Sequence, residues 1–252
     1  MKKFNKKYLF YFLIILIIIS FVWFDLIFLN ENNKMFAEEL KKAGEVSDVI
    51  IIFNSGGFGT VALENAYDFK PIIDNLEKTI KDMDYSVSIV TYYRTKETLM
   101  GRIGYLKEMF FDFPKQSKYV SGQIKEFLED NPNDKILMAG LSNGAAFVRA
   151  TMNNINNSSD NVLAIELGSP FWANSSQNDK ILFLDNNGSD VLTVGNKKEI
   201  IESLLKTPFN WIYSRILNKR ISLAEAIDAP GHHYYWEDIK DNVVTFVENN
   251  LK

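Results

Sequence analysis

Ser142 is the residue whose surroundings most strongly indicate chemistry. It lies at the centre of residues 140–144, which read GLSNG and match the pattern G-x-S-x-G. In this pattern the glycines let a strand turn sharply into a helix, so that the serine hydroxyl projects into a cleft. Residues 135–139 read as the strand and residues 145–155 as the helix that the turn requires. We therefore predict that Ser142 is a nucleophile; the alternative is a tight turn in which the serine only caps a helix.

The histidines of the chain are confined to one place. His232 and His233 are the only two, and they follow Gly231 shortly before the predicted last helix, residues 242–251. A metal site with three histidine ligands is therefore excluded. When a serine, an acid and a histidine occur in that order, the base lies on a loop before the final helix. We predict His232 as the base because it directly follows Gly231, and His233 stays the alternative.

An acid is expected after a late strand, between the serine and the histidine. Asp190 fits, because the strand-like residues 180–185 end in a turn, residues 186–189, just before it. Asp185 ends the strand itself and is assigned a structural role. Glu166, at the end of the preceding strand, is the reserve candidate.

A glycine-rich loop could stabilise negative charge. Residues 55–59 read SGGFG and follow the first strand, residues 49–53. Flexible glycine loops can aim backbone N–H groups at a developing oxyanion. We predict that the N–H groups of Gly57 and Phe58 form an oxyanion hole together with the N–H of Asn143, which follows the proposed nucleophile.

The body of the chain alternates between strands and helices. Short apolar runs predict strands at 49–53, 85–93, 135–139, 161–167 and 180–185. Helical spacing predicts helices over 62–83 with a break at Pro71, over 107–129 with an interruption near Pro114, over 145–155, and over 242–251. This alternation predicts an α/β fold with a mainly parallel sheet of about six strands and helices on both faces.

Taken together, the order of these motifs resembles the α/β-hydrolase superfamily over roughly residues 48–252. The tail that begins at Gly231, GHHYYWEDI, is similar to the G-H-x-Y-x-W ending of some bacterial members. The resemblance implies a three-layer α/β-hydrolase fold and hydrolysis of esters, amides or thioesters without a cofactor. The chain departs from the family in lacking the usual His-Gly before the oxyanion loop. It also has only residues 168–179 where a cap domain is commonly inserted.

A second, longer insertion precedes the histidines. Residues 195–228 contain Phe209, Trp211, Tyr213, Ile216 and Leu217. This aromatic-rich stretch could form the wall of an acyl pocket. Ordinary helix packing is the alternative.

The N-terminus predicts a membrane anchor. Residues 8–29 form an apolar run of 22 residues, long enough to span the roughly 30 Å core of a bilayer. Four lysines precede the run and should hold the N-terminus in the cytoplasm, with the rest of the chain outside. Residues 1–30 are thus a basic stub and anchor, residues 31–47 a polar stalk, and residues 48–252 the hydrolase domain. A cleaved signal peptide is the alternative.

Composition excludes several classes of function. The 252 residues carry a net charge of −4, and because residues 1–30 carry four lysines against one aspartate, the remainder carries −7. Such an acidic body is unsuited to nucleic acid, whose binding depends on phosphate neutralisation. The chain has no cysteine, which excludes thiolate metal sites and a cysteine nucleophile. We expect neither a cofactor nor a metal ion, and the oligomeric state stays open.

The sequence as a whole favours a membrane-anchored serine hydrolase that cleaves carboxylic esters. Its predicted location outside the membrane suggests lipid or envelope-derived esters as substrates. One alternative is a non-catalytic binding module with the same fold. A weaker one is an NADP-binding protein, because residues 57–62 (GFGTVA) fit G-x-G-x-x-A and Arg94 follows the next strand.

Overall fold

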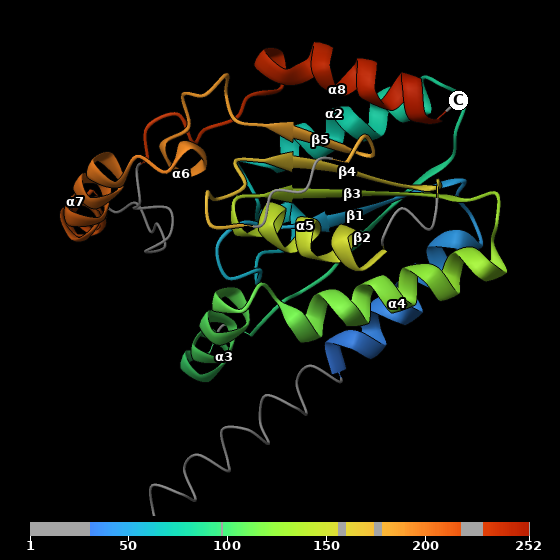
Figure 1. Ribbon diagram of the computed structural model, residues 1–252, viewed down its shortest axis with the longest axis horizontal. Coiled ribbons are helices and arrows are strands. Elements are labelled where there is room, and N and C mark those ends of the chain that lie inside the picture. Colours follow the sequence, from blue (N-terminus) through green and yellow to red (C-terminus); the bar gives the residue numbers. More distant parts are fainter. Residues whose placement is uncertain (1–30, 97, 156–159, 174–177, 218–228, 252) are drawn as a thin grey trace, which may run out of the picture.

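The computed structural model describes residues 31–96, 98–155, 160–173, 178–217 and 229–251. Its centre is a parallel sheet of five strands in the order β2-β1-β3-β4-β5 (Figure 1). These strands are β1 Val49–Asn54, β2 Val87–Thr91, β3 Lys135–Leu141, β4 Val162–Leu167 and β5 Ile181–Leu184. The described residues thus form five strands, rather than the expected six or so, and every neighbouring pair is parallel.

Helices cover both faces of the sheet, as the sequence predicts (Figure 1). The helix over residues 31–44, α4 Pro114–Asp130 and α5 Asn143–Ile155 cover one face, and α2 Lys70–Lys81 and α8 Trp236–Leu251 cover the other. The remaining elements are the 3-10 helix η1 Leu63–Asn65, α3 Leu99–Phe110, α6 Val191–Val194 and α7 Lys197–Ile216.

The strands are apolar because the sheet is buried on both faces. All six residues of β1 are buried, and their side chains alternate between two hydrophobic clusters. Ile50 and Ile52 face the cluster beneath α4 and α5, whereas Ile51 and Phe53 face the cluster beneath α2 and α8. A continuous apolar run is typical of a central parallel strand, so β1 fixes the middle of the fold.

Two prolines begin helices. Pro71 lies in the first turn of α2, and Pro114 is the first residue of α4. Proline fits there because its fixed φ is helical and its missing N–H would have no partner in the first turn. The expected break at Pro71 is therefore the start of a separate helix, preceded only by η1.

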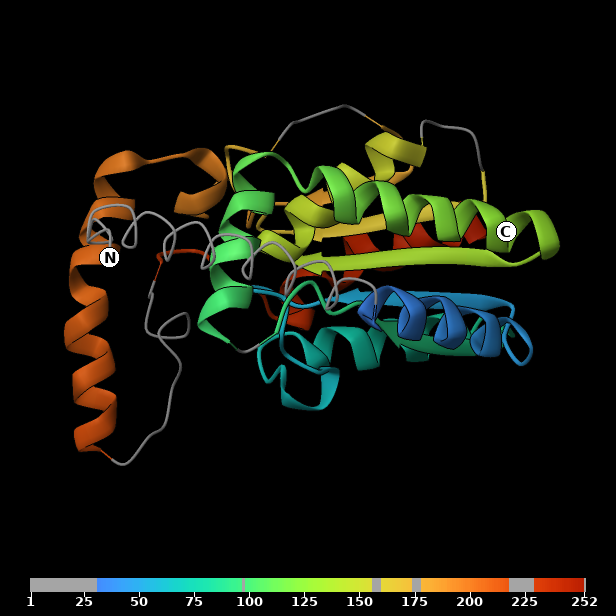
Figure 2. The same ribbon diagram turned by 90° about the horizontal axis from the view of Figure 1, so that it is seen from below.

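The expected polar stalk is part of the folded body. Residues 31–44 form a helix whose Phe36, Leu40 and Ala43 are buried in the core at helical spacing. The Phe36 ring packs edge-on against Tyr92 with 5.2 Å between ring centres. Figure 2 shows this helix, in blue, lying alongside α4. The helix 31–44 consequently packs against the rest of the body through its apolar side.

Within the part of the chain that the structure describes, no helix combines the length and apolar character needed to cross a bilayer. The predicted anchor, residues 8–29, lies outside the described residues.

Helix α7 turns apolar side chains to the outside. Leu205, Phe209 and Ile216 lie on one side of the helix and are exposed, whereas Ser203 and Thr207 are buried. These three side chains of the aromatic-rich insertion therefore neither line an acyl pocket nor pack in the core. Residues 218–228 of the same insertion lie outside the described residues.

Candidate active site

The candidate residues gather at the edge of the sheet where the carboxyl ends of the strands meet. The chain crosses from β1 to β2 on one side and returns to β3 on the other. Ligands of open parallel sheets bind at such a reversal of strand order, outside the carboxyl ends. The loop 55–59 follows β1, and Ser142 follows β3, so both lie at this reversal.

The backbone at Ser142 forms the sharp turn that the motif predicts. Ser142 has φ of 55°, a left-handed conformation that is rare for residues other than glycine. Its N–H donates to the carbonyl of Leu167 at the end of β4, 2.8 Å away. A Cβ on Gly140 would come within 2.6 Å of the Gly144 backbone, and one on Gly144 would collide with the Asn54 carbonyl. Both glycines are therefore required by close packing of β1, β3 and α5.

His232 and Asp190 form a close pair. His232 Nδ1 lies 2.8 Å from Asp190 Oδ2, and the Asp190 side chain is completely buried. Asp190 also accepts hydrogen bonds from the Leu192 N–H at 2.9 Å and from the Tyr234 hydroxyl at 2.7 Å. Burial pushes the pKa of Asp190 upward, but the hydrogen bonds from His232, Tyr234 and Leu192 outweigh it and hold this pKa below its usual value. The carboxylate is thus charged and fixed at neutral pH.

The loop that carries His232 is fastened to the turn after β5. Asn186 Nδ2 donates to the carbonyls of Gly231 and His233, at 2.6 and 2.9 Å. Gly231 has φ of 74°, and a Cβ there would collide with the Ser189 carbonyl. This path directs His232 toward Asp190 and leaves His233 exposed. Of the two histidines, the structure pairs His232 with the acid.

Gly168, directly after β4, lets the three candidates approach one another. A Cβ on Gly168 would lie 2.7 Å from His232 Cε1 and 2.8 Å from Asp190 Oδ2. The preceding residue, Leu167, accepts the Ser142 N–H. Ser142 and the His232–Asp190 pair therefore flank the same short stretch of chain. Among the described residues, the Ser142 hydroxyl has no hydrogen bond to His232; such contacts often tighten only when substrate binds.

The glycine loop lies beside Ser142. A Cβ on Gly56 would lie 3.8 Å from Ser142 Cβ. A turn closes this loop, with the Gly59 N–H donating to the Gly56 carbonyl at 3.1 Å. In the described part of the chain, the N–H groups of Gly57, Phe58 and Asn143 have no acceptor. Unpaired donors near a reactive serine are what an oxyanion hole needs.

The other acidic candidates have structural partners. Arg149 on α5 binds both carboxylate oxygens of Glu166, with Nη2 to Oε2 at 2.6 Å. Burial raises the pKa of Glu166 to about 7, although Arg149 opposes the shift. Asp185 accepts the Asp190 N–H through its backbone carbonyl. Glu166 is thus held by α5, so the reserve candidate is not the residue that meets His232.

Sequence reasoning missed two residues of the site. Tyr234 buries its ring and donates to Asp190, and its signal in the sequence was its place as the Y of the G-H-x-Y-x-W ending. Arg94 is buried behind the glycine loop, where its guanidinium contacts the carbonyls of Ser55 and Asn143. Its position after β2 suggested a nucleotide phosphate instead.

The dinucleotide interpretation does not fit the structure. The fingerprint requires a helix that begins at the glycine loop and points its N-terminus at the pyrophosphate. Here the loop leads into η1, and the long helix α2 begins only at Lys70. Arg94, the residue expected to meet the 2′-phosphate, is 1% exposed.

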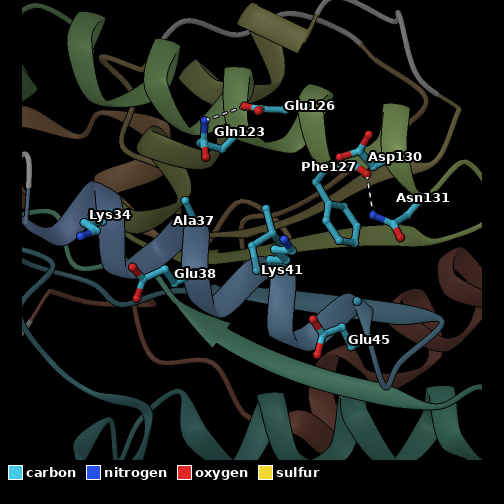
Figure 3. Close-up of a pocket in the computed structure, with 12 residues that line it drawn as sticks. Lys34, Ala37, Glu38, Lys41, Glu45, Gln123, Glu126, Phe127, Asp130 and Asn131 are labelled. Carbon is cyan, nitrogen blue, oxygen red and sulfur yellow. Dashed lines mark hydrogen bonds between the residues drawn. The ribbon is translucent and has the colours of Figure 1, made fainter.

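A groove of about 510 Å³ lies elsewhere, between the helix 31–44 and α4 (Figure 3). Its walls carry Lys34, Glu38, Lys41, Glu126 and Asp130. None of the candidate site residues lines it. Within the described residues, no three His, Cys, Asp or Glu side chains form a group that could hold a metal ion.

Comparison with known proteins gives a likeness of fold and no relative by sequence. No protein-family model and no curated protein matches the chain. Among solved structures, the chain is similar to a Trichoderma reesei cutinase in complex with a C11Y4 phosphonate inhibitor. The sequence identity is 13%, the match covers 89% of this chain and 90% of the cutinase, and the TM-score is 0.49. A likeness this distant assigns no activity to the chain.

The geometry of the site, by contrast, indicates a chemistry. A serine on a left-handed turn, a histidine fixed by a buried carboxylate, and unpaired backbone donors meet at one edge of the sheet. These are the parts that nucleophilic catalysis on a carbonyl requires.

Proposed function

We propose that the protein is a serine hydrolase that cleaves carboxylic esters through an acyl-enzyme. The observation that carries this proposal is the 2.8 Å contact between His232 Nδ1 and the buried carboxylate of Asp190, beside the turn that presents Ser142. A carboxylate that accepts from Nδ1–H leaves Nε2 free to accept a proton. The remaining parts serve the same reaction.

In this mechanism Ser142 Oγ attacks the ester carbonyl while His232 Nε2 accepts its proton. The carbonyl oxygen becomes an oxyanion that accepts hydrogen bonds from the N–H groups of Asn143 and of Gly57 or Phe58. His232 then returns the proton to the leaving alcohol. Water then attacks the acyl-enzyme while His232 Nε2 accepts its proton, and His232 returns that proton to Ser142 Oγ as the carboxylic acid leaves. Asp190 stabilises the imidazolium each time.

We further propose that residues 8–29 anchor the enzyme in a membrane, with the N-terminus in the cytoplasm and the hydrolase body outside. The support is the apolar run and its four preceding lysines. Esters from membrane lipid or from the cell envelope are then the nearest substrates.

A fluorophosphonate probe tests the enzymatic proposal directly. The full chain should form an adduct at Ser142 that mass spectrometry locates, and Ser142→Ala and His232→Ala should each abolish it. His233→Ala is the matched control, because that side chain is exposed, and it should label as the wild type does. A folded wild-type chain that fails to label would favour the non-catalytic binding module.

The absence of cysteine makes the topology testable. Val46 is exposed, so Val46→Cys places a single thiol on the body of the full chain. A membrane-impermeant maleimide added to intact cells should label that thiol. Labelling that requires the cells to be broken would contradict the proposed orientation.

A further inference from the structure

Arg94 is a fully buried cation that connects the two halves of the proposed oxyanion hole. Its Nη1 donates to the carbonyl of Asn143 at 2.5 Å and to the Tyr105 hydroxyl at 3.3 Å. Its Nη2 donates to the carbonyl of Ser55. One planar guanidinium therefore contacts both the glycine loop after β1 and the start of α5.

Among the residues that the structure describes, no carboxylate pairs with this charge. None of the ion pairs formed by the described residues includes Arg94, and its guanidinium lies 5.4–5.8 Å from the ring centres of Tyr105, Phe113 and Phe147. Burial lowers the pKa of Arg94, but a guanidinium stays protonated at neutral pH. An unpaired buried charge is expensive, and apolar replacements of buried ionic groups are often neutral or stabilising. Stability alone therefore does not account for Arg94.

The backbone of Arg94 holds the far end of the same loop. Its N–H donates to the Gly59 carbonyl at 2.9 Å, while Gln116 Nε2 donates to the Arg94 carbonyl at 2.9 Å. The loop is thus fixed at Ser55 by the side chain and at Gly59 by the main chain. These contacts therefore fix both ends of the loop whose middle carries the N–H groups of Gly57 and Phe58.

The position of the glycine loop relative to the start of α5 determines whether the N–H donors of both can reach the same oxyanion. The loop supplies the N–H of Gly57 or Phe58, and α5 supplies the N–H of Asn143. Donors of an oxyanion hole must lie 2.7–3.1 Å from the oxyanion, so a small shift of the loop against α5 would remove one of them.

We propose that Arg94 is a positioning residue for the hydrolysis: it holds the glycine loop and the start of α5 together, so that their N–H groups can meet at one oxyanion. This inference rests on the proposed ester hydrolysis and goes beyond it, because Arg94 touches neither Ser142 nor the substrate.

Two substitutions of Arg94 in the full chain test the role. With a p-nitrophenyl ester as substrate, Arg94→Met should lower kcat by about 100-fold, the size of effect known for a lost oxyanion donor, while KM changes less than threefold. Arg94→Lys keeps the charge but has a single donor nitrogen in place of the guanidinium fork, so it should recover about tenfold of that loss. The rate of fluorophosphonate labelling at Ser142 should follow kcat. Tyr105→Phe removes the weakest partner and should keep kcat within threefold.

Thermal unfolding of each variant separates positioning from folding. A folded Arg94→Met chain with wild-type kcat and labelling rate overturns the role of Arg94 and leaves the hydrolase proposal intact. The role of Arg94 is also overturned if both Arg94→Met and Arg94→Lys lose the fold, or if kcat falls only in proportion to the unfolded fraction. A folded wild-type chain that neither labels nor turns over the ester overturns the hydrolase proposal, and the inference with it.

Discussion

At the scale of single residues, the Asp190 carboxylate connects three parts of the candidate site. It contacts His232, the Leu192 N–H and the Tyr234 hydroxyl, all within 2.9 Å. Such a set fixes the carboxylate, and the carboxylate in turn fixes the imidazole. Tyr234 therefore acts on His232 through Asp190.

Tyr234→Phe should weaken both the fold and the activity. A lost hydrogen bond to a charged group costs about 1.5–3 kcal/mol of unfolding free energy, which denaturant titration can measure. Ester turnover should also fall, because Asp190 loses one of the contacts that fix it. Tyr235→Phe is the matched control, since that neighbour is exposed, and it should change neither quantity.

The deficit of Tyr234→Phe should depend on pH. Because its hydrogen bonds hold the pKa of Asp190 below the usual value, ionisation of Asp190 stabilises the fold above about pH 4. That contribution is lost as the pH falls through the lowered pKa. Denaturant titrations from pH 7 to pH 3 should therefore show the wild type and the variant converging, and a constant difference would contradict the assignment.

At the scale of elements, the turn at Ser142 depends on glycines that let α5 approach β1. Gly144→Ala places a Cβ against the Asn54 carbonyl, a backbone atom that cannot rotate away. We expect a loss of about 1–3 kcal/mol in unfolding free energy and a misplaced Ser142. Turnover and fluorophosphonate labelling should both decrease.

Gly122→Ala in α4 is the contrasting change. A Cβ there meets nothing within 4 Å, so only the helix propensity changes. Thermal unfolding should show a gain of about 0.5–1 kcal/mol, with unchanged labelling. If both glycine variants behaved alike, close packing at the turn would not be the reason for Gly144.

Short motifs and apolar runs were enough to predict the order of the elements and the pairing of His232 with Asp190. Such motifs and runs detect only residues that are adjacent in the sequence or that recur at a regular spacing. Arg94 could not be predicted, because its partners Ser55 and Asn143 lie far apart in sequence. The helix 31–44 was not predicted because its charged, exposed residues outnumber its buried apolar ones, Phe36, Leu40 and Ala43. The anchor stays a prediction.

At the scale of the whole molecule, the helix 31–44 is part of the core. Phe36→Ala should cost about 3–5 kcal/mol of unfolding free energy, because it leaves a cavity between this helix and Tyr92. Met35→Ala, on the exposed side, should stay within about 0.5 kcal/mol. Chemical denaturation of both variants measures the difference. Equal effects would mean that the helix contributes little to the body.

The start of this helix also determines how far from a membrane the proposed hydrolase could act. Asn32 Nδ2 donates to the Tyr93 carbonyl just beyond β2, so the body is entered close to the edge that carries Ser142. An anchor that ended at residue 29 would be separated from the first residue of the helix 31–44 by residue 30 alone, a span of about 7 Å at full extension. The active site of such an anchored hydrolase would stay within a thin layer at the surface of one membrane. Lipid esters are concentrated in that layer, whereas substrates farther from the membrane would be out of reach.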